Sequence, residues 1–186
     1  MSRFLSLFLL LTLSLFAAEP KKYLGIGLGI GSGYQEWAYN EQHNYFLGST
    51  YDDLYWYDFD ATVKEVKLGF DYETFRLEIS SISIDLDIKD KENKRLSGID
   101  IDYILPFFKD NDSLFPFFAI GIGSYSNAFA FNMNFGLSFA VTDTIQMELA
   151  YKLKSIQGRT IKTSQGDNLD ISNQVYYGYF GLKFML

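Results

Sequence analysis

Nine charged residues stand at alternate positions in segments that have the two-residue period of a β-strand. They comprise five acids and four bases: Glu65, Lys67, Arg76, Glu78, Asp100, Asp102, Glu148, Lys152 and Lys183. Successive side chains of a strand point to opposite faces of a sheet, so we expect these charges to share one face. Acids and bases in nearly equal number on an enclosed face favour a network of ion pairs that fills it. The alternative is that they line a narrow or gated conduit.

Catalytic and metal-binding patterns are not found. His43 is the only histidine, and no serine follows it at the spacing of a His–Ser dyad. The acidic pairs at residues 52–53 and 110–112 lack the spacing of a calcium loop, and ordinary turn chemistry explains them. Because the chain has no cysteine, disulfides and thiolate metal sites are excluded. We therefore expect no catalytic residue, no metal and no cofactor.

Eight segments alternate between apolar and polar residues and predict eight β-strands. They cover residues 23–33, 59–70, 75–88, 99–105, 118–123, 129–141, 146–153 and 177–186. In the third segment the alternation changes phase near Ser80 and Ser81, which predicts a bulge or a strand end there. We find no helical period, and no segment after the leader has a continuous apolar run long enough for a spanning helix.

The lengths of the connections indicate how the strands are joined. Connections after the first, third and seventh strands are long or polar, whereas those after the second and sixth are tight turns. The connection at residues 106–116 is longer than this rule expects. Alternating long and short connections are typical of an up-and-down antiparallel barrel in a membrane. We therefore predict an all-β, eight-stranded, antiparallel transmembrane barrel whose last strand closes against its first.

The character of the two strand faces separates a membrane barrel from a soluble one. The sixth strand has seven large apolar residues on one face, from Phe129 to Val141, which would overfill a narrow barrel interior but match lipid. Its other face and those of the first and fifth strands carry Gly, Ala, Ser and Asn, which suit a narrow interior. A soluble barrel would instead direct charged residues outward. The alternative is a soluble periplasmic barrel or sandwich.

The first 18 residues predict a secretory signal peptide, with Arg3 before an apolar run and Ala17-Ala18 before a polar segment. The alternative for this segment is a membrane-anchor helix. Residues 19–186 then form the barrel domain. The formal charge of −7 becomes −8 when Arg3 is removed, which argues against nucleic acid as a partner.

The chain resembles the small outer-membrane β-barrel family that includes OmpA-type transmembrane domains and OmpX-like proteins. The matching residues are the segments 116–123 and 136–151 and the terminal strand. The resemblance implies insertion by the outer-membrane assembly machinery. We expect the barrel to lie in the outer membrane of a Gram-negative bacterium and to be a monomer. The terminal strand of this family usually ends in an aromatic residue, whereas this chain ends in Leu186.

Aromatic residues gather in the predicted loop at residues 34–58. They form either an interfacial girdle or a surface that binds a hydrophobic ligand, a glycan or a protein: Trp37, Tyr39, Tyr45, Phe46, Tyr51, Tyr55 and Trp56. Basic residues of the predicted outer loops are available to lipopolysaccharide phosphates or are ordinary solvated charges: Lys89, Lys91, Lys94, Arg95, Arg159 and Lys162.

The expected role is therefore structural or surface-interactive and non-catalytic, with outer-membrane lipid and lipopolysaccharide as partners. A small channel for ions or hydrophobic solutes is the first alternative. An enzyme that modifies envelope lipid is the second, with His43 as its only histidine.

Overall fold

The structure is a computed structural model and describes residues 19–40, 53–72, 74–88, 94–108, 114–125, 128–162 and 168–186. Within these residues the chain forms eight strands: β1 (Lys21–Asn40), β2 (Asp53–Asp71), β3 (Arg76–Ile88), β4 (Lys94–Pro106), β5 (Leu114–Tyr125), β6 (Ala128–Ala140), β7 (Ile145–Lys162) and β8 (Asn168–Met185). The predicted signal peptide, residues 1–18, lies outside the described part. The described residues contain no helix long and apolar enough to cross a membrane.

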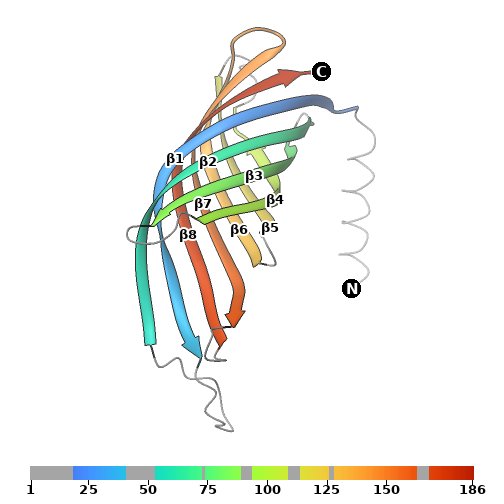
Figure 1. The fold of residues 1–186 in the computed structure, drawn as a ribbon. Helices are drawn as coiled ribbons and strands as arrows, with labels where there is room; N and C mark the ends of the chain where they lie inside the picture. Colours follow the sequence, from blue (N-terminus) through green and yellow to red (C-terminus); the bar gives the residue numbers. More distant parts are fainter. Residues whose placement is uncertain are drawn as a thin grey trace, which may run out of the picture.

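The eight strands close into one antiparallel barrel, which confirms the predicted fold class (Figure 1). Each strand pairs with its neighbour in the sequence, and β8 pairs with β1 from Tyr23↔Met185 to Asn40↔Asn168. Beside the Tyr23↔Met185 pair, the Leu186 amide donates to the Lys22 carbonyl at 2.8 Å. We name the end of the barrel that holds Lys21 and Met185 the terminus end, and the opposite end the loop end.

The strands are staggered, so that a row of paired residues climbs as it goes round the barrel. From Leu24 the row passes through Leu68, Ile79, Ile101, Ile122, Phe131, Ser155 and Gln174. It returns to β1 at Tyr34, ten residues closer to the loop end than Leu24. Each strand step therefore climbs by a little over one residue. Such a stagger tilts the strands of an eight-stranded barrel by about 35–45°.

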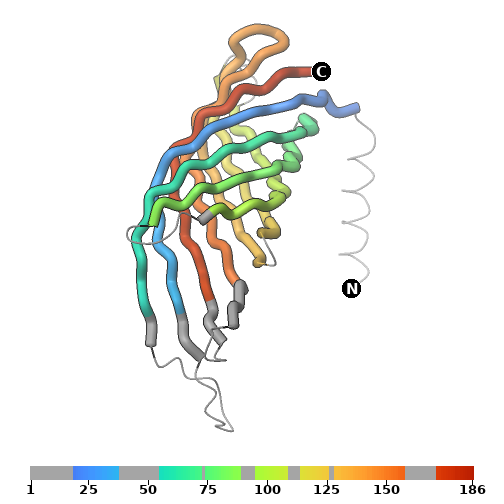
Figure 2. The backbone as a smooth tube through the Cα atoms, viewed as in Figure 1, coloured from blue at the N-terminus to red at the C-terminus, as the bar shows by residue number. Residues whose placement is uncertain are grey.

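One side of the barrel is taller than the other. β1, β2, β7 and β8 have 20, 19, 18 and 18 residues, whereas the other four strands have 12 or 13. Because β7, β8, β1 and β2 are neighbours, their extensions form one continuous wall at the loop end (Figure 2). The predicted loop at residues 34–58 is therefore strand at both of its ends, since β1 continues to Asn40 and β2 begins at Asp53.

The predicted bulge or strand end near Ser80 and Ser81 is wrong. β3 pairs with β2 without interruption from Asp71↔Arg76 to Phe59↔Ile88. Ser80 and Ile82 both point inward and are buried, and Ser81 lies on the outer face between them. The phase of the pattern changes because the apolar residues move from the outer face to the inner face at this point, and the polar residues move the other way. The backbone stays regular. Among the described residues, the pairing of β7 with β8 shifts register between Ile156 and Arg159.

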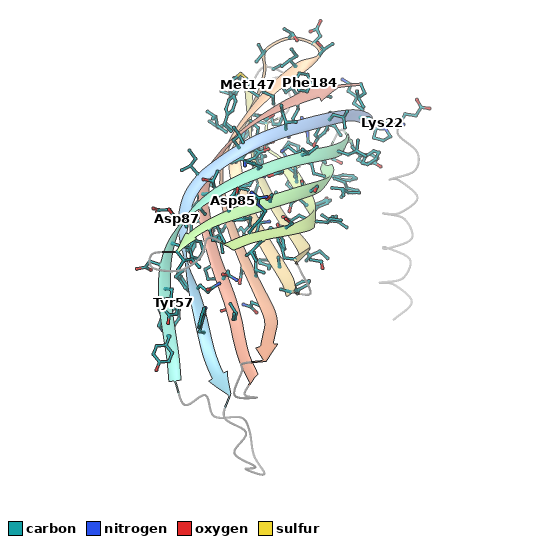
Figure 3. All side chains as sticks on the ribbon, in the orientation of Figure 1. Lys22, Tyr57, Asp85, Asp87, Met147 and Phe184 are labelled. Carbon is teal, nitrogen blue, oxygen red and sulfur yellow. The ribbon has the colours of Figure 1, made fainter. Side chains whose placement is uncertain are left out.

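This exchange of apolar and polar faces divides the barrel into two halves. Toward the terminus end the outer face is apolar and the inner face is charged. Toward the loop end of β2 and β3 the outer face carries Lys64, Asp85 and Asp87, and the inner face carries buried aliphatic residues such as Val63 and Ile84. Asp85 and Asp87 lie far from Met147 and Phe184, which stand near the terminus end (Figure 3).

Candidate functional site

All nine charged residues predicted to share a face point into the barrel, and each is at most 4% exposed. Lys67 is the centre of the first cluster. Its Nζ atom lies 3.0 Å from Glu148 Oε1 and 3.1 Å from Glu78 Oε2. Glu65 Oε1 is 3.8 Å away. One ammonium group thus faces carboxylates from its own strand, from β3 and from β7.

Further bases surround the same carboxylates. Lys183 Nζ lies 2.8 Å from Glu78 Oε1 and also pairs with Glu148. Lys152 Nζ lies 2.8 Å from Glu65 Oε2, and the Ser80 hydroxyl donates to the other oxygen of that carboxylate at 3.1 Å. Every carboxylate of this cluster therefore has at least one base beside it. This is the arrangement that makes buried charges tolerable, because an unpaired charge in such a place is costly.

A second cluster lies around Asp100 and Asp102 on β4. Asp100 pairs with Lys154 and accepts a hydrogen bond from the Tyr125 hydroxyl at 3.0 Å. Asp102 accepts hydrogen bonds from the side-chain amides of Asn132 and Asn134 at 3.3 and 3.4 Å. Lys154 was not among the predicted residues. Its signal was available, since it continues the alternation of Glu148 and Lys152 by one step.

Arg76 lies near the terminus end of the barrel interior and is 1% exposed. Its guanidinium pairs with Asp71 at 2.8 Å and donates to Gln146 at 3.3 Å. Its central carbon also lies 4.6 Å from the centre of the Phe115 ring. The guanidinium and the aromatic ring together cover this end of the charged clusters.

The glycines of β1 make room for the network. A Cβ atom added to Gly27 would overlap the ring of Tyr179, and one added to Gly25 would lie 2.6 Å from Lys67 Cγ. The Tyr179 ring in turn lies 3.8 Å from Lys152 Nζ and 5.0 Å from Lys67 Nζ, measured to the ring centre. Cations over aromatic faces are stabilised further by the ring quadrupole. The side chains of Tyr179 and Lys67 thus pack directly against the glycines of β1.

Nearer the loop end, the interior is filled by an apolar core. It is formed by buried residues from seven of the strands: Phe59, Ala61, Val63, Ile82, Ile84, Leu86, Ile88, Leu96, Tyr125, Ala128, Ala130, Ile156, Val175, Tyr177 and Tyr179. Val63, Ile84, Ala130 and Val175 are fully buried. The interior is therefore mainly charged toward the terminus end and mainly apolar toward the loop end. A smaller apolar cluster of Ile104, Phe117 and Ala119 lies in the charged half. The larger apolar core is the part of the interior that the sequence reasoning missed.

The wall carries aromatic residues on both faces. On its inner face the rings of Trp37 and Tyr57 are 5.0 Å apart, and Trp37 Nε1 donates to Gln35 at 2.6 Å. On its outer face the Tyr34 ring lies 5.2 Å from that of Trp56 and 6.3 Å from that of Tyr176.

The predicted aromatic surface is therefore divided between strands and residues outside the described part. Trp37 and Tyr39 lie on β1, and Tyr55 and Trp56 lie on β2. Tyr55 and Trp56 are exposed. Tyr45, Phe46, Tyr51 and His43 lie outside the described residues.

The other predicted polar sites are also placed only in part. Lys94 and Arg95 belong to β4, and Arg159 and Lys162 to β7, so these bases lie on strands and not in loops. Lys89, Lys91 and the acidic residues 110–112 lie outside the described part. Where the structure describes the chain, no cluster of three or more acids or histidines is arranged to hold a metal ion.

Comparison with solved structures supports the fold. Neisserial surface protein A matches over 88% of this chain and 97% of its own, with 13% identity and a TM-score of 0.52. The outer membrane protein OprG from Pseudomonas aeruginosa covers 90% of this chain and 98% of its own, with 12% identity and a TM-score of 0.45. No protein-family model and no curated protein matches the sequence. The chain thus has the fold of a small outer-membrane β-barrel.

Proposed function

We propose that this chain is an outer-membrane barrel with a closed interior, whose role is structural and surface-interactive and not catalytic. The resemblance of the segments 116–123 and 136–151 and of the terminal strand to OmpA-type and OmpX-like proteins supports this placement. The assembly machinery of the outer membrane and the surrounding lipid are the partners that the placement implies, and we expect a monomer.

The outer face supports the membrane placement. Leu28 and Val66 are each 59% exposed, and Ile30 is 78% exposed. On β6 every outward residue from Phe129 to Leu137 is large, apolar and exposed or nearly so. A soluble protein rarely exposes such a continuous apolar surface, whereas lipid requires it. This supports a membrane barrel over a soluble periplasmic one.

The single observation that carries the closed interior is its filling by two different layers. A hydrated ion would have to cross the paired charges around Lys67 and then the dry core around Ile84. Opening the first layer would separate buried ion pairs, and opening the second would hydrate apolar side chains. Both rearrangements are unfavourable, which supports a filled barrel over a channel for ions or hydrophobic solutes.

The experiment is a conductance measurement on the purified chain in planar lipid bilayers, with a trimeric porin as the positive control. We expect little steady conductance, because the filled interior leaves no continuous aqueous path. Large and stable channels would contradict the proposal and favour the transport alternative. Lipid analysis tests the enzymatic alternative by comparing cells that express the unmodified chain with cells that express His43→Ala. We expect the two sets of cells to have identical envelope lipids.

The surface-interactive part of the proposal is supported by the wall. The cluster of Tyr34, Trp56 and Tyr176 presents aromatic rings on rigid strands, and aromatic residues dominate the anchors of binding interfaces. We expect Trp56→Ala to weaken adhesion or ligand binding by intact cells while the barrel folds normally.

A further inference from the structure

The outer face of the barrel has a groove of about 600 Å³. It is lined by residues of β1, β2, β3, β4 and β8 and lies within the apolar band. Its walls toward β1 and β8 are apolar and include Ile26, Leu28 and Phe180. Its floor toward β3 and β4 is formed by the small polar residues Ser81, Ser83 and Ser97. Lys64 is its only lysine or arginine among the described lining residues. The groove is hollow because serines stand where neighbouring strands have large side chains.

The register of the strands shows that these polar residues interrupt the apolar band. Ser81 pairs with Val66 on one side and with Ile99 on the other. Rows climb toward the loop end from β1 to β4, so Ile99 lies closer to the loop end than Ser81 does. Ile99 is nevertheless apolar and 58% exposed. The polar character of Ser81 therefore does not come from the end of the band.

Lys64 stands in the same interruption. It lies two residues from Thr62, on the terminus side, and Thr62 pairs with Ile30. Since each strand step climbs by about one residue, Lys64 is slightly nearer the terminus end than Ile30. An ammonium group thus sits at the level of an apolar residue that is 78% exposed. The groove and the interruption of the band are formed by the same residues, Lys64 and Ser81.

The charge of Lys64 is available to an anion. Its Nζ atom lies 3.5 Å from Asp85 Oδ2, and its side chain is 59% exposed. Asp85 has a closer partner in Arg95, whose Nε lies 2.6 Å from Asp85 Oδ1. A phosphate that binds Lys64 from the lipid side would leave Asp85 paired with Arg95. The hydroxyls of Ser81 and Ser83 are donors beside the same position.

We propose that this groove binds one lipid A unit of lipopolysaccharide from the surrounding leaflet. The inference rests on the proposed membrane placement. A phosphate contacts Lys64 and the serine hydroxyls through charge-assisted hydrogen bonds. One acyl chain lies against Ile26, Val66 and Phe180. The occupant is an anionic lipid because the cation and the hydroxyls interrupt the apolar band on the loop-end side of the apolar wall. This order matches a headgroup followed by its acyl chain.

The test is native mass spectrometry of the folded full-length mature chain in detergent, titrated with lipid A. We expect Lys64→Gln to weaken lipid A binding about tenfold, as loss of one charge-assisted contact does. Ser81→Phe fills the groove and should reduce binding to the non-specific level. Lys22→Gln is the matched control, because Lys22 is an exposed lysine of β1 at the terminus end, and its binding should equal that of the unmodified chain.

Three results would overturn the proposal. The first is equal lipid A binding by Lys64→Gln and the unmodified chain. The second is phosphatidylglycerol that binds as tightly as lipid A, which would show no preference for lipid A. The third is a dimer of the unmodified chain that becomes a monomer in Ser81→Phe while lipid A binding is unchanged. This result would show that the groove binds a second copy of the chain. Ser83→Leu replaces Ser81→Phe if that variant lacks the heat-modifiable gel mobility of a folded barrel. Channel activity in bilayers would contradict the closed interior alone, because the groove lies outside the barrel.

Discussion

Lys67 of β2 and Glu148 of β7 meet inside the barrel with 3.0 Å between Nζ and Oε1, although β1 and β8 lie between their strands. The glycines of β1 permit this contact, because larger side chains at Gly25 and Gly27 would occupy the space of Lys67 and Tyr179. This ion pair, together with that of Lys152 and Glu65, thus connects two strands that do not pair through their backbones.

Removal of Lys67 should be strongly destabilising. In Lys67→Met, Glu78 and Glu148 lose one of their two bases and Glu65 loses a nearby cation, so buried negative charge is left in excess. We expect the free energy of unfolding to fall by about 3–5 kcal/mol. Urea titration of the barrel in lipid vesicles measures this. Lys22→Met is the control, and a loss in Lys67→Met as small as in that variant would argue against a tightly coupled network.

Gly27→Val should prevent normal packing of β8 against β1. Its side chain would occupy the position of the Tyr179 ring, which cannot move without leaving Lys152. We expect a loss of about 1–3 kcal/mol, the usual range for overpacking. Gly178→Ala is a matched control, since a Cβ there has only the Ile30 carbonyl nearby, at 3.9 Å. The two variants should differ clearly in thermal unfolding, and equal stability would refute the packing argument.

The dry core near the loop end predicts opposite results at neighbouring positions of β2. Val63 points inward and is fully buried, whereas Thr62 points outward and is exposed. We expect Val63→Asp to destabilise the barrel by about 3 kcal/mol or more, because it places an unpaired carboxylate among aliphatic side chains. Thr62→Asp should change stability by about 0.5 kcal/mol or less. Comparable stability of the two variants would show that water already enters this half.

Single cysteines can locate the exchange of faces on β3, because the chain has no cysteine of its own. A membrane-impermeant maleimide applied to intact cells should label Asp87→Cys rapidly and leave Ile79→Cys unlabelled, since the first lies beyond the apolar band and the second within it. Labelling after solubilisation and denaturation confirms that both cysteines are present. Rapid labelling of Ile79→Cys in cells would place the boundary elsewhere.

Alternation predicted the barrel and its charged face because a period of two residues is set locally by the strand backbone. Ser81 shows the limit of that reasoning. A change of phase has two causes, an extra residue or an exchange of environment, and the residues themselves do not distinguish them. The pairing of Lys67 with Glu148 was also beyond prediction, since it depends on the stagger of the whole barrel. The length of β1 was underestimated because Trp37 and its neighbours alternate without a clear difference in polarity.

The exchange of faces along β3 sets how deep the barrel sits in the bilayer. A shift of two residues toward the cell would draw Asp85 toward the hydrocarbon, and a shift outward would leave Leu77 and Ile79 in water. Both displacements raise the free energy, as charged residues do in lipid and apolar residues do in water. The boundary between apolar and polar residues on the outer face therefore sets the depth of the barrel in the bilayer. We accordingly expect the strands themselves to set the height of the wall relative to the bilayer.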